Sequence, residues 1–388
     1  IDHCGEVASA AGHETISCST VVWKTCPMSI PTISVIMATY NHAPFVAQAI
    51  ESVLNQVGVD FEFLISDDGS QDETRNVVAS ISDPRIRFYP NEVNRGACVV
   101  TNELIERASG EFIALLNSDD YWSGPDKLAC QLQIMRDNPK LGACFGRARF
   151  VDRDGKAILK SSIPFGTVFD QENRSQGAWL RRFFDLGNCI CHPTMLIRKS
   201  CYEELGMYSN RLRQLPDFDM WIRLVKHYPI HIADRELINF RLLPGENAAS
   251  QTPVNSIRTM NEHYMIADGY FDDVSREVFL DGFADLVKFR GVLTDVHVDI
   301  EKALLYFDDN QWLGRAYKLV GILAVRKLLE NPVHRGVMER DYGIGDHWFQ
   351  QKMGEYDIIR SNIVAEILDK KQGIKSLMLR MFSNFISR

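Results

Sequence analysis

Residues 112–120 read FIALLNSDD, an apolar run that stops at two adjacent carboxylates. Residues 61–70 follow the same plan, with FEFLIS before DDGS. A buried strand of an α/β protein carries its ligand-binding side chains at its carboxyl end, and neighbouring acidic groups repel each other unless a cation lies between them. The sequence therefore predicts that Asp67–Asp68 and Asp119–Asp120 line one crevice, suited to a phosphate-bearing nucleotide held through a divalent metal.

Strand-like and helix-like segments alternate around these two stretches. Residues 32–38 are apolar and β-branched, a loop follows at 40–44, and the next segment has apolar positions at helical spacing. This alternation implies right-handed crossovers and a largely parallel sheet covered by helices on both faces. The further predicted strands are 86–89, 141–145 and 194–197, and the further predicted helices are 73–82, 98–108, 125–137, 199–205 and 219–227.

The composition restricts the class of protein. A chain of 388 residues with 45% hydrophobic content is long enough for two domains, and we expect a poorly ordered segment at 1–30, an α/β domain at 31–245 and a helical region at 246–388. The net charge of -8 argues against a nucleic-acid binder. Nine cysteines without C-x-x-C spacing favour a reducing, cytoplasmic location, and no apolar run approaches the roughly 20 residues of a membrane span.

The last 19 residues, 370–388, have apolar side chains on one helical face and only positive charges elsewhere. Such a helix could lie on an anionic membrane, as a peripheral contact at the inner face of the plasma membrane. The same stripe suits a terminal helix that docks on its own domain or on a second subunit, so both interpretations remain open.

Six short motifs follow one another between about residue 31 and residue 243. They read SVIMATYN (34–41), DDGS (67–70), NRG (94–96), SGEF (109–112), NSDD (117–120) and PDFDMWIRL (216–224). In order and spacing this set resembles the inverting nucleotide-sugar glycosyltransferases of family two. The resemblance implies the GT-A fold, a Rossmann-like, mostly parallel sheet with helices on both faces.

The resemblance also implies a reaction and its partners. A sugar would pass from a nucleoside-diphosphate donor, most often a UDP-sugar, to a hydroxyl of a carbohydrate or lipid-linked acceptor. This is the chemistry of cell-surface polysaccharide or lipid-linked oligosaccharide assembly on the cytoplasmic side of the membrane. The helical region lies outside the resemblance.

The nucleotide-binding residues of the family fall on the first two motifs and their neighbours. By this resemblance Thr39, Asn41 and Asp68 would hold the base and ribose. The full set assigned to the nucleotide sugar is Thr39, Asn41, Asp67, Asp68, Gly96 and Asn117. The alternative is that the acidic pair caps the next helix, which would explain one Asp but not two.

The family's metal-binding D-x-D element falls on residues 117–120, where this chain has Asn117 at the first place. Asp119 and Asp120 remain, and oxygen ligands of this kind favour Mg²⁺ or Mn²⁺. Which of the two is the direct ligand stays open. The alternative is an acidic turn that caps the helix near Pro125.

Asp217 occupies the position of the family's catalytic base, although Pro216 precedes it where an acidic residue is usual. Inverting transfer needs a group that takes the proton from the acceptor hydroxyl, and a carboxylate within hydrogen-bond reach can do so. The alternative is a helix cap, formed by Asp217 itself or by Asp219. Trp221 and Leu224 are spaced for a buried helical face, and His192 is interpreted as a structural histidine and only a weak site candidate.

Two rival functions remain. A nucleotidyltransferase also places carboxylates and metal at strand ends, but residues 38–42 lack the basic, glycine-rich phosphate loop that it would usually have. The second rival is a catalytically inactive nucleotide-sugar-binding module, in which Asn117 and Pro216 would mark lost catalysis.

Overall fold

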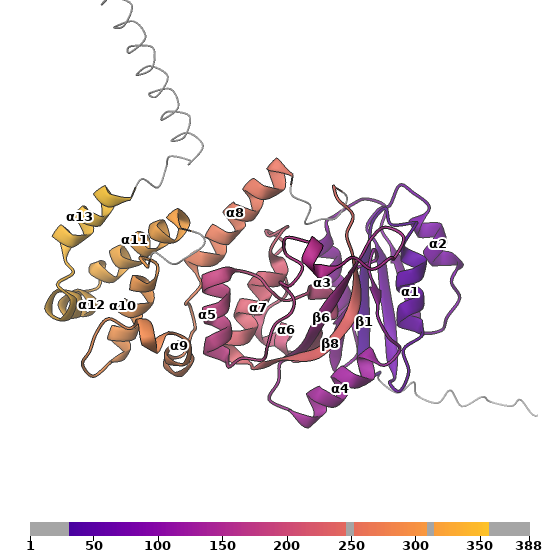
Figure 1. Ribbon diagram of the computed structural model, residues 1–388, viewed down its shortest axis with the longest axis horizontal. Helices are drawn as coiled ribbons and strands as arrows, with labels where there is room; N and C mark the ends of the chain where they lie inside the picture. Colours follow the sequence, from indigo (N-terminus) through magenta and orange to yellow (C-terminus); the bar gives the residue numbers. More distant parts are fainter. Residues whose placement is uncertain (1–30, 246–251, 309–313, 357–388) are drawn as a thin grey trace, which may run out of the picture. The chain divides into compact units, whose positions relative to one another are not determined.

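The computed structural model describes residues 31–245, 252–308 and 314–356, which belong to one compact unit (Figure 1). The predictions for the segment at 1–30 and for the terminal helix at 370–388 lie outside the described residues. No helix in the described ranges is both long and apolar enough to cross a membrane.

Eight strands of the described chain form one sheet in the order β3-β2-β1-β4-β7-β6-β8-β5. The pairs β1–β2, β1–β4, β2–β3 and β6–β8 are parallel, and β4–β7, β6–β7 and β5–β8 are antiparallel. The strands are β1 (Ile33–Thr39), β2 (Phe61–Asp67), β3 (Ile86–Pro90), β4 (Phe112–Leu115), β5 (Tyr121–Trp122), β6 (Ala143–Val151), β7 (Leu196–Arg198) and β8 (Ile230–Arg241).

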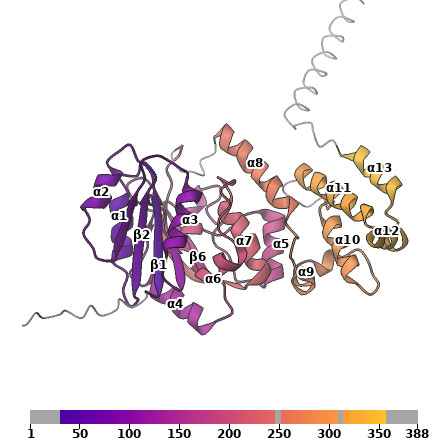
Figure 2. The same cartoon turned by 180° about the vertical axis from the view of Figure 1, so that it is seen from behind.

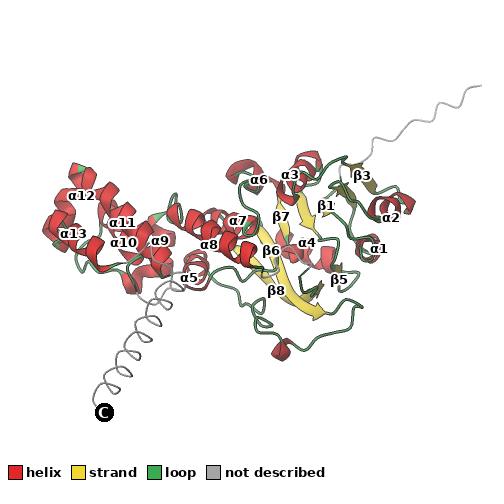
Figure 3. Ribbon diagram, turned by 90° about the horizontal axis from the view of Figure 1, so that it is seen from above, coloured by secondary structure: helices red, strands yellow, loops and turns green. Residues whose placement is uncertain are grey.

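Helices cover both faces of this sheet. Alternate residues of each strand point to opposite faces, so each strand contributes side chains to a core on either side. On β1, Val35 and Met37 belong to the core beneath α1 and α4, whereas Ile36 belongs to the core beneath α3, α5 and α7. Figure 3 shows these helices around the sheet. The helices of this part are α1 (Val46–Leu54), α2 (Thr74–Ser80), α3 (Ala97–Arg107), α4 (Lys127–Asp137), α5 (Gln176–Leu186), α6 (Lys199–Leu205) and α7 (Pro216–His227). The predicted α/β architecture is confirmed.

The helices after β8 pack on the α/β part through the α5 face of the core (Figure 2). Phe184 of α5 stacks on Tyr317 with ring centroids 4.7 Å apart and meets Phe271 at 5.1 Å. A smaller apolar cluster around Met338 holds the last helices together. These helices are α8 (Pro253–Asp268), α9 (Arg276–Phe283), α10 (Asp295–Leu305), α11 (Arg315–Glu330), α12 (Pro332–Val337) and α13 (Asp346–Glu355). The domain boundary near residue 245 stays a prediction.

Candidate active site

The carboxyl ends of β1 and β2 lie side by side, with Thr39 opposite Asp67 in the parallel register. Hydrogen bonds then tie the loops that follow. The backbone N–H of Asn41 donates to Ser70 Oγ at 2.9 Å, and the Asn41 side-chain oxygen accepts the backbone N–H of Gln71 at 2.8 Å. Asn41 has a φ of 53°, a left-handed conformation that Asn tolerates better than most residues. Its side chain therefore fixes the DDGS turn.

Asp68 is buried, and its carboxylate holds the loop before α3. One oxygen accepts the backbone N–H of Arg95 at 2.8 Å and the other accepts that of Gly96 at 2.9 Å. Gly96 has a φ of 97°, so a side chain there would be strained even though a Cβ would meet no atom within 4 Å. The third motif is thus joined to the second by a carboxylate and two amides.

Asp67 is fully buried and is not a helix cap. Its Oδ1 accepts the backbone N–H of Ser70 at 3.1 Å and Nε of Arg75 at 3.3 Å. Helix α2 begins after Glu73 and its N-cap makes no side-chain hydrogen bond, so the capping alternative is wrong for this acidic pair. Asp67 Oδ2 and Thr39 Oγ1 are buried without a hydrogen-bond partner in the described chain. Buried polar atoms normally have partners, so these two oxygens are candidates for contact with a ligand.

The second acidic pair is braced by the end of β8. Asp120 accepts the backbone N–H of Arg241 at 2.7 Å on Oδ1 and the side-chain amide of Asn117 at 3.2 Å on Oδ2. Burial, reinforced by the neighbouring Asp119, raises the pKa of Asp120 well above its usual value. Helix α4 has Asp126 at its N-cap position, so the alternative that this pair caps α4 is also wrong.

Arg241 was not among the predicted site residues, yet its buried guanidinium holds the NSDD loop in place. It donates to the backbone carbonyl of Asp119 at 2.9 Å, to that of Asp152 at 3.1 Å and to Gln48 Oε1 at 2.6 Å, and it also contacts the carbonyl of Arg153. Nothing in the local sequence pattern signals this role, because the partners lie 88 to 193 residues away.

His42 joins the first loop to the NSDD loop. Its Nδ1 lies 2.7 Å from Ser118 Oγ, and the backbone N–H of His42 donates to Thr74 Oγ1 at 2.8 Å. Together with the Asn41–Ser70 bond, these contacts interlock the loops after β1, β2 and β4. The structure therefore brings the two predicted acidic pairs to one edge of the sheet.

Asp217 lies in the first turn of α7 and is partly buried. Burial raises its pKa to about 6, although hydrogen bonds from the Phe218 backbone and from Asn188, at 2.9 Å, work in the opposite direction. The N-cap position of α7 is Leu215, which makes no side-chain cap, and Asp219 pairs with Arg223 at 2.9 Å. Neither acidic residue is therefore the N-cap of α7, although Asp217 accepts a backbone hydrogen bond within the first turn of the helix.

Two thiols connect Asp217 to the acidic pairs: that of Cys191, which is buried, and that of Cys98, which is half-buried and donates to the backbone carbonyl of Leu212 at 3.3 Å. Burial raises the pKa of Cys191, and the charges of Asp120 and Asp217 raise it further. Burial and then Asp217 likewise raise the pKa of Cys98, which is two residues beyond the Gly96 amide bound by Asp68. Asp217 thus belongs to the same region as the two acidic pairs.

The remaining predictions concern residues behind the site. Trp221 and Leu224 are fully buried, as their spacing predicted. His192 Nε2 lies 2.9 Å from the Tyr208 hydroxyl, and burial lowers its pKa to about 4. His192 is therefore neutral at neutral pH, half-buried and hydrogen-bonded to Tyr208, which agrees with its interpretation as a structural histidine.

Known proteins are similar to this chain in sequence. A family model described as "Glycosyl transferase family 2" matches residues 34–206. The chain is 29% identical over 229 residues to an uncharacterized glycosyltransferase of Methanocaldococcus jannaschii, covering 58% of this chain and 75% of the relative. It is 35% identical over 139 residues, or 35% of this chain and 54% of the relative, to the Escherichia coli enzyme named UDP-Glc:alpha-D-GlcNAc-diphosphoundecaprenol beta-1,3-glucosyltransferase.

A solved structure has the same fold. The crystal structure of residues 1–349 of S. aureus TarS in complex with UDP-GlcNAc superposes with a TM-score of 0.53 at 15% identity. The superposition covers 84% of this chain and 93% of that one. At this identity the likeness supports the fold alone.

Proposed function

Because this chain belongs to glycosyltransferase family 2, and therefore transfers sugars, we propose that it moves a sugar from a nucleoside-diphosphate donor to a hydroxyl acceptor by one inverting displacement. The observation that carries the proposal is the interlocking of the loops after β1, β2 and β4 beside the first turn of α7. The loops supply polar oxygens that can bind a nucleotide, and the carboxylates of Asp119 and Asp120 that can bind a cation. The first turn of α7 supplies the carboxylate of Asp217, which can accept a proton.

Asp217 is the proposed catalytic base. A carboxyl group with a pKa of about 6 is largely ionised at neutral pH and is basic enough to accept a proton from a hydroxyl that is attacking carbon. Asn188 holds one of its oxygens, which fixes the orientation of the group. Pro216 begins α7, where a missing N–H costs nothing, so its presence is compatible with a working base.

The donor set of the NSDD loop fits Mg²⁺ or Mn²⁺, which favour carboxylate oxygens. Asp119 and Asp120 are the proposed metal ligands, and Asp120 also accepts hydrogen bonds from Asn117 and from the backbone of Arg241. Asp120 would thereby also brace the loop, and donor phosphates and water would complete the coordination. When bound, the ion offsets the negative charge that develops on the departing diphosphate.

The nucleotide is proposed to contact Thr39, Asp67, Asp68 and Gly96. This is supported by the two buried oxygens without partners, on Thr39 and Asp67, which donor groups of a ligand could satisfy. Asn41 and Asn117 would act from behind, since their side chains hold the DDGS turn and Asp120.

A UDP-sugar donor and a lipid-linked or carbohydrate acceptor are proposed from the relatives, one of which is named for transfer from UDP-Glc to a diphosphoundecaprenol-linked sugar. A cytoplasmic location and peripheral membrane contact through residues 370–388 belong to the same proposal.

The experiment is turnover of a panel of nucleoside-diphosphate sugars, followed as nucleotide release with and without Mn²⁺. Release that requires the metal and a functional Asp217 supports the proposal. Tight donor binding without any release, even with candidate acceptors, would instead favour a binding module.

A further inference from the structure

Glu262 lies on α8, beyond all the motifs that describe the active site, yet it contacts the segment that leads to Asp217. Its Oε1 accepts the backbone N–H of Arg213, and its Oε2 accepts those of Gln214 and Leu215, all at 2.8 Å. The side chain is 3% exposed. Successive backbone N–H groups form a concavity that binds anions, and here the anion is a carboxylate from another helix.

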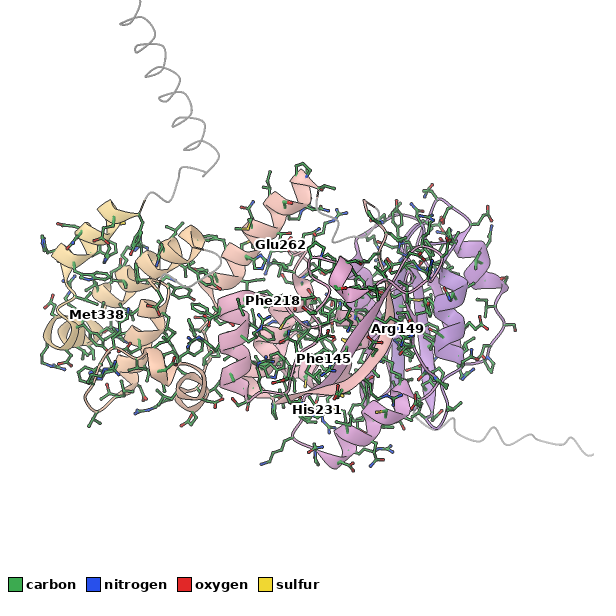
Figure 4. All side chains as sticks on the ribbon, viewed as in Figure 1. Phe145, Arg149, Phe218, His231, Glu262 and Met338 are labelled. Atoms are coloured by element: carbon green, nitrogen blue, oxygen red, sulfur yellow. The ribbon has the colours of Figure 1, made fainter. Side chains whose placement is uncertain are left out.

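This carboxylate acts at the start of the helix that carries the proposed base. Leu215 is the N-cap residue of α7, and Asp217 follows two positions later. Beside Glu262, the ring of His263 meets that of Phe218 with centroids 5.7 Å apart, so α8 contacts α7 on both sides of the turn. Figure 4 labels Glu262 and Phe218. The first turn of α7 is therefore fixed from outside the α/β part.

We propose that Glu262 is a positioning residue for the sugar-transfer reaction, because it fixes the first turn of α7 and thereby the location and the electrostatic surroundings of Asp217. This inference rests on the proposed function, in which Asp217 is the base. It links the helical region to catalysis through the position of Asp217.

The charge of Glu262 matters as well as its hydrogen bonds. Burial is the main reason why the pKa of Asp217 is high, and repulsion by Glu262 adds to it. Burial raises the pKa of Cys98, Cys191 and Tyr208, and lowers that of His192, so these neighbours are uncharged near pH 6. The groups facing this turn are Cys98 on α3, Asn188, Cys191 and His192 before β7, Tyr208 after α6, Glu262 and His263 on α8, and the Asp219–Arg223 pair on α7 itself.

The test compares Glu262→Gln with Glu262→Asp in the full chain. Gln keeps the size but places an NH₂ group against backbone donors, whereas Asp keeps the charge but is too short to reach all three amides. We expect kcat to fall about 10- to 100-fold in both variants, while the Kd for UDP with Mn²⁺ stays unchanged. Only Glu262→Gln removes the negative charge near Asp217. It should therefore shift the acid limb of the pH profile of kcat by roughly half a pH unit toward lower pH.

A matched control is Glu301→Gln on α10. Glu301 is 1% exposed, and it also accepts two backbone N–H groups, those of Lys288 at 2.9 Å and Phe289 at 2.7 Å. Because Asp217 is not among its partners, this variant should lose stability but keep the wild-type kcat and pH profile.

The outcomes separate this inference from the proposed function. Normal turnover by Asp217→Asn, or no turnover of any nucleotide sugar by the wild type, would overturn the proposed function and this inference with it. An inactive Asp217→Asn protein beside Glu262→Gln with wild-type kcat and an unmoved acid limb would overturn only the role of Glu262. Loss of folding in both Glu262 variants, with a folded control, would show a purely structural role and overturn the inference too.

Discussion

Replacement of Asp217 by Asn should stabilise the protein at neutral pH while it removes the proposed base. Burial raises the pKa of this carboxyl group from 3.8 to about 6. The difference of about two pH units corresponds to about 3 kcal/mol, at about 1.4 kcal/mol per unit. Asp217 is partly exposed and keeps some hydration, so we expect about 1–3 kcal/mol in the folded protein.

The sign follows from the direction of the change in pKa. Because the folded-state pKa lies above the unfolded value, the contribution of the carboxyl group to stability is fully present below about pH 3.8 and is lost as the pH rises through about 6. Asn has no charge at either pH, and its amide oxygen can still accept the hydrogen bond from Asn188. The advantage of Asp217→Asn should therefore appear between about pH 4 and pH 6 and stay constant above.

The assay is urea unfolding of both proteins at pH 4 and pH 8, combined with steady-state turnover. We expect kcat to fall by about two orders of magnitude or more with little change in donor affinity. The kcat of the wild type should decline below about pH 6. Asp219→Asn is the matched control, because loss of the Asp219–Arg223 pair should destabilise slightly without reducing kcat. An equal stability difference at both pH values would refute the burial argument, and near-normal turnover would remove Asp217 from its role.

Three further predictions concern the surroundings of the site. Arg241→Lys should lower the free energy of unfolding in urea by about 2–4 kcal/mol and weaken Mn²⁺-dependent UDP binding, because an ammonium group cannot reach all the acceptors of the guanidinium. Unchanged UDP binding would contradict the bracing role of Arg241. Asp119→Asn should weaken Mn²⁺-dependent UDP binding at least about tenfold, measured by titration calorimetry, and an equal affinity with and without chelator in the wild type would remove the metal. Phe184→Ala should lower the unfolding free energy by about 3–5 kcal/mol, and a loss below about 1 kcal/mol would show that the ring cluster is not a shared core.

The elements that the sequence predicts well are those with a strong local pattern. Strands β1 and β2 are mostly apolar, and α6 has the predicted bounds, Lys199–Leu205. Strand β8 was not predicted, because exposed residues Asp234 and Arg235 interrupt its apolar pattern at the point where its register with β6 shifts. Helix α5, whose sequence is QGAWLRRFFDL, was also missed, although its aromatic residues form the centre of the larger core.

The predicted site residues share a different property. The acidic pairs were recognisable because each follows an apolar strand, and parallel pairing of β1 with β2 and β4 brings their ends to one edge. Arg241 and Glu262 could not be recognised, because each acts on backbone groups that are remote in the sequence. A side chain that binds a backbone amide or carbonyl imposes no residue type on its partner, so no paired motif remains in the sequence.

The connection between the α/β part and the helical region carries two separate braces. Arg241, at the end of β8, holds the loop of the proposed metal ligands, and Glu262, on the next helix, holds the turn before the proposed base. Both groups of the proposed reaction are therefore oriented by residues that lie outside the acidic motifs themselves. The α8 helix and its successors also cover Phe184 and its neighbours. A change in the packing of these helices would therefore move the turn of Asp217, and it would reach α3 and the loop held by Asp68 through the bonds of Cys98 to Leu212 and of Asn102 to Tyr208.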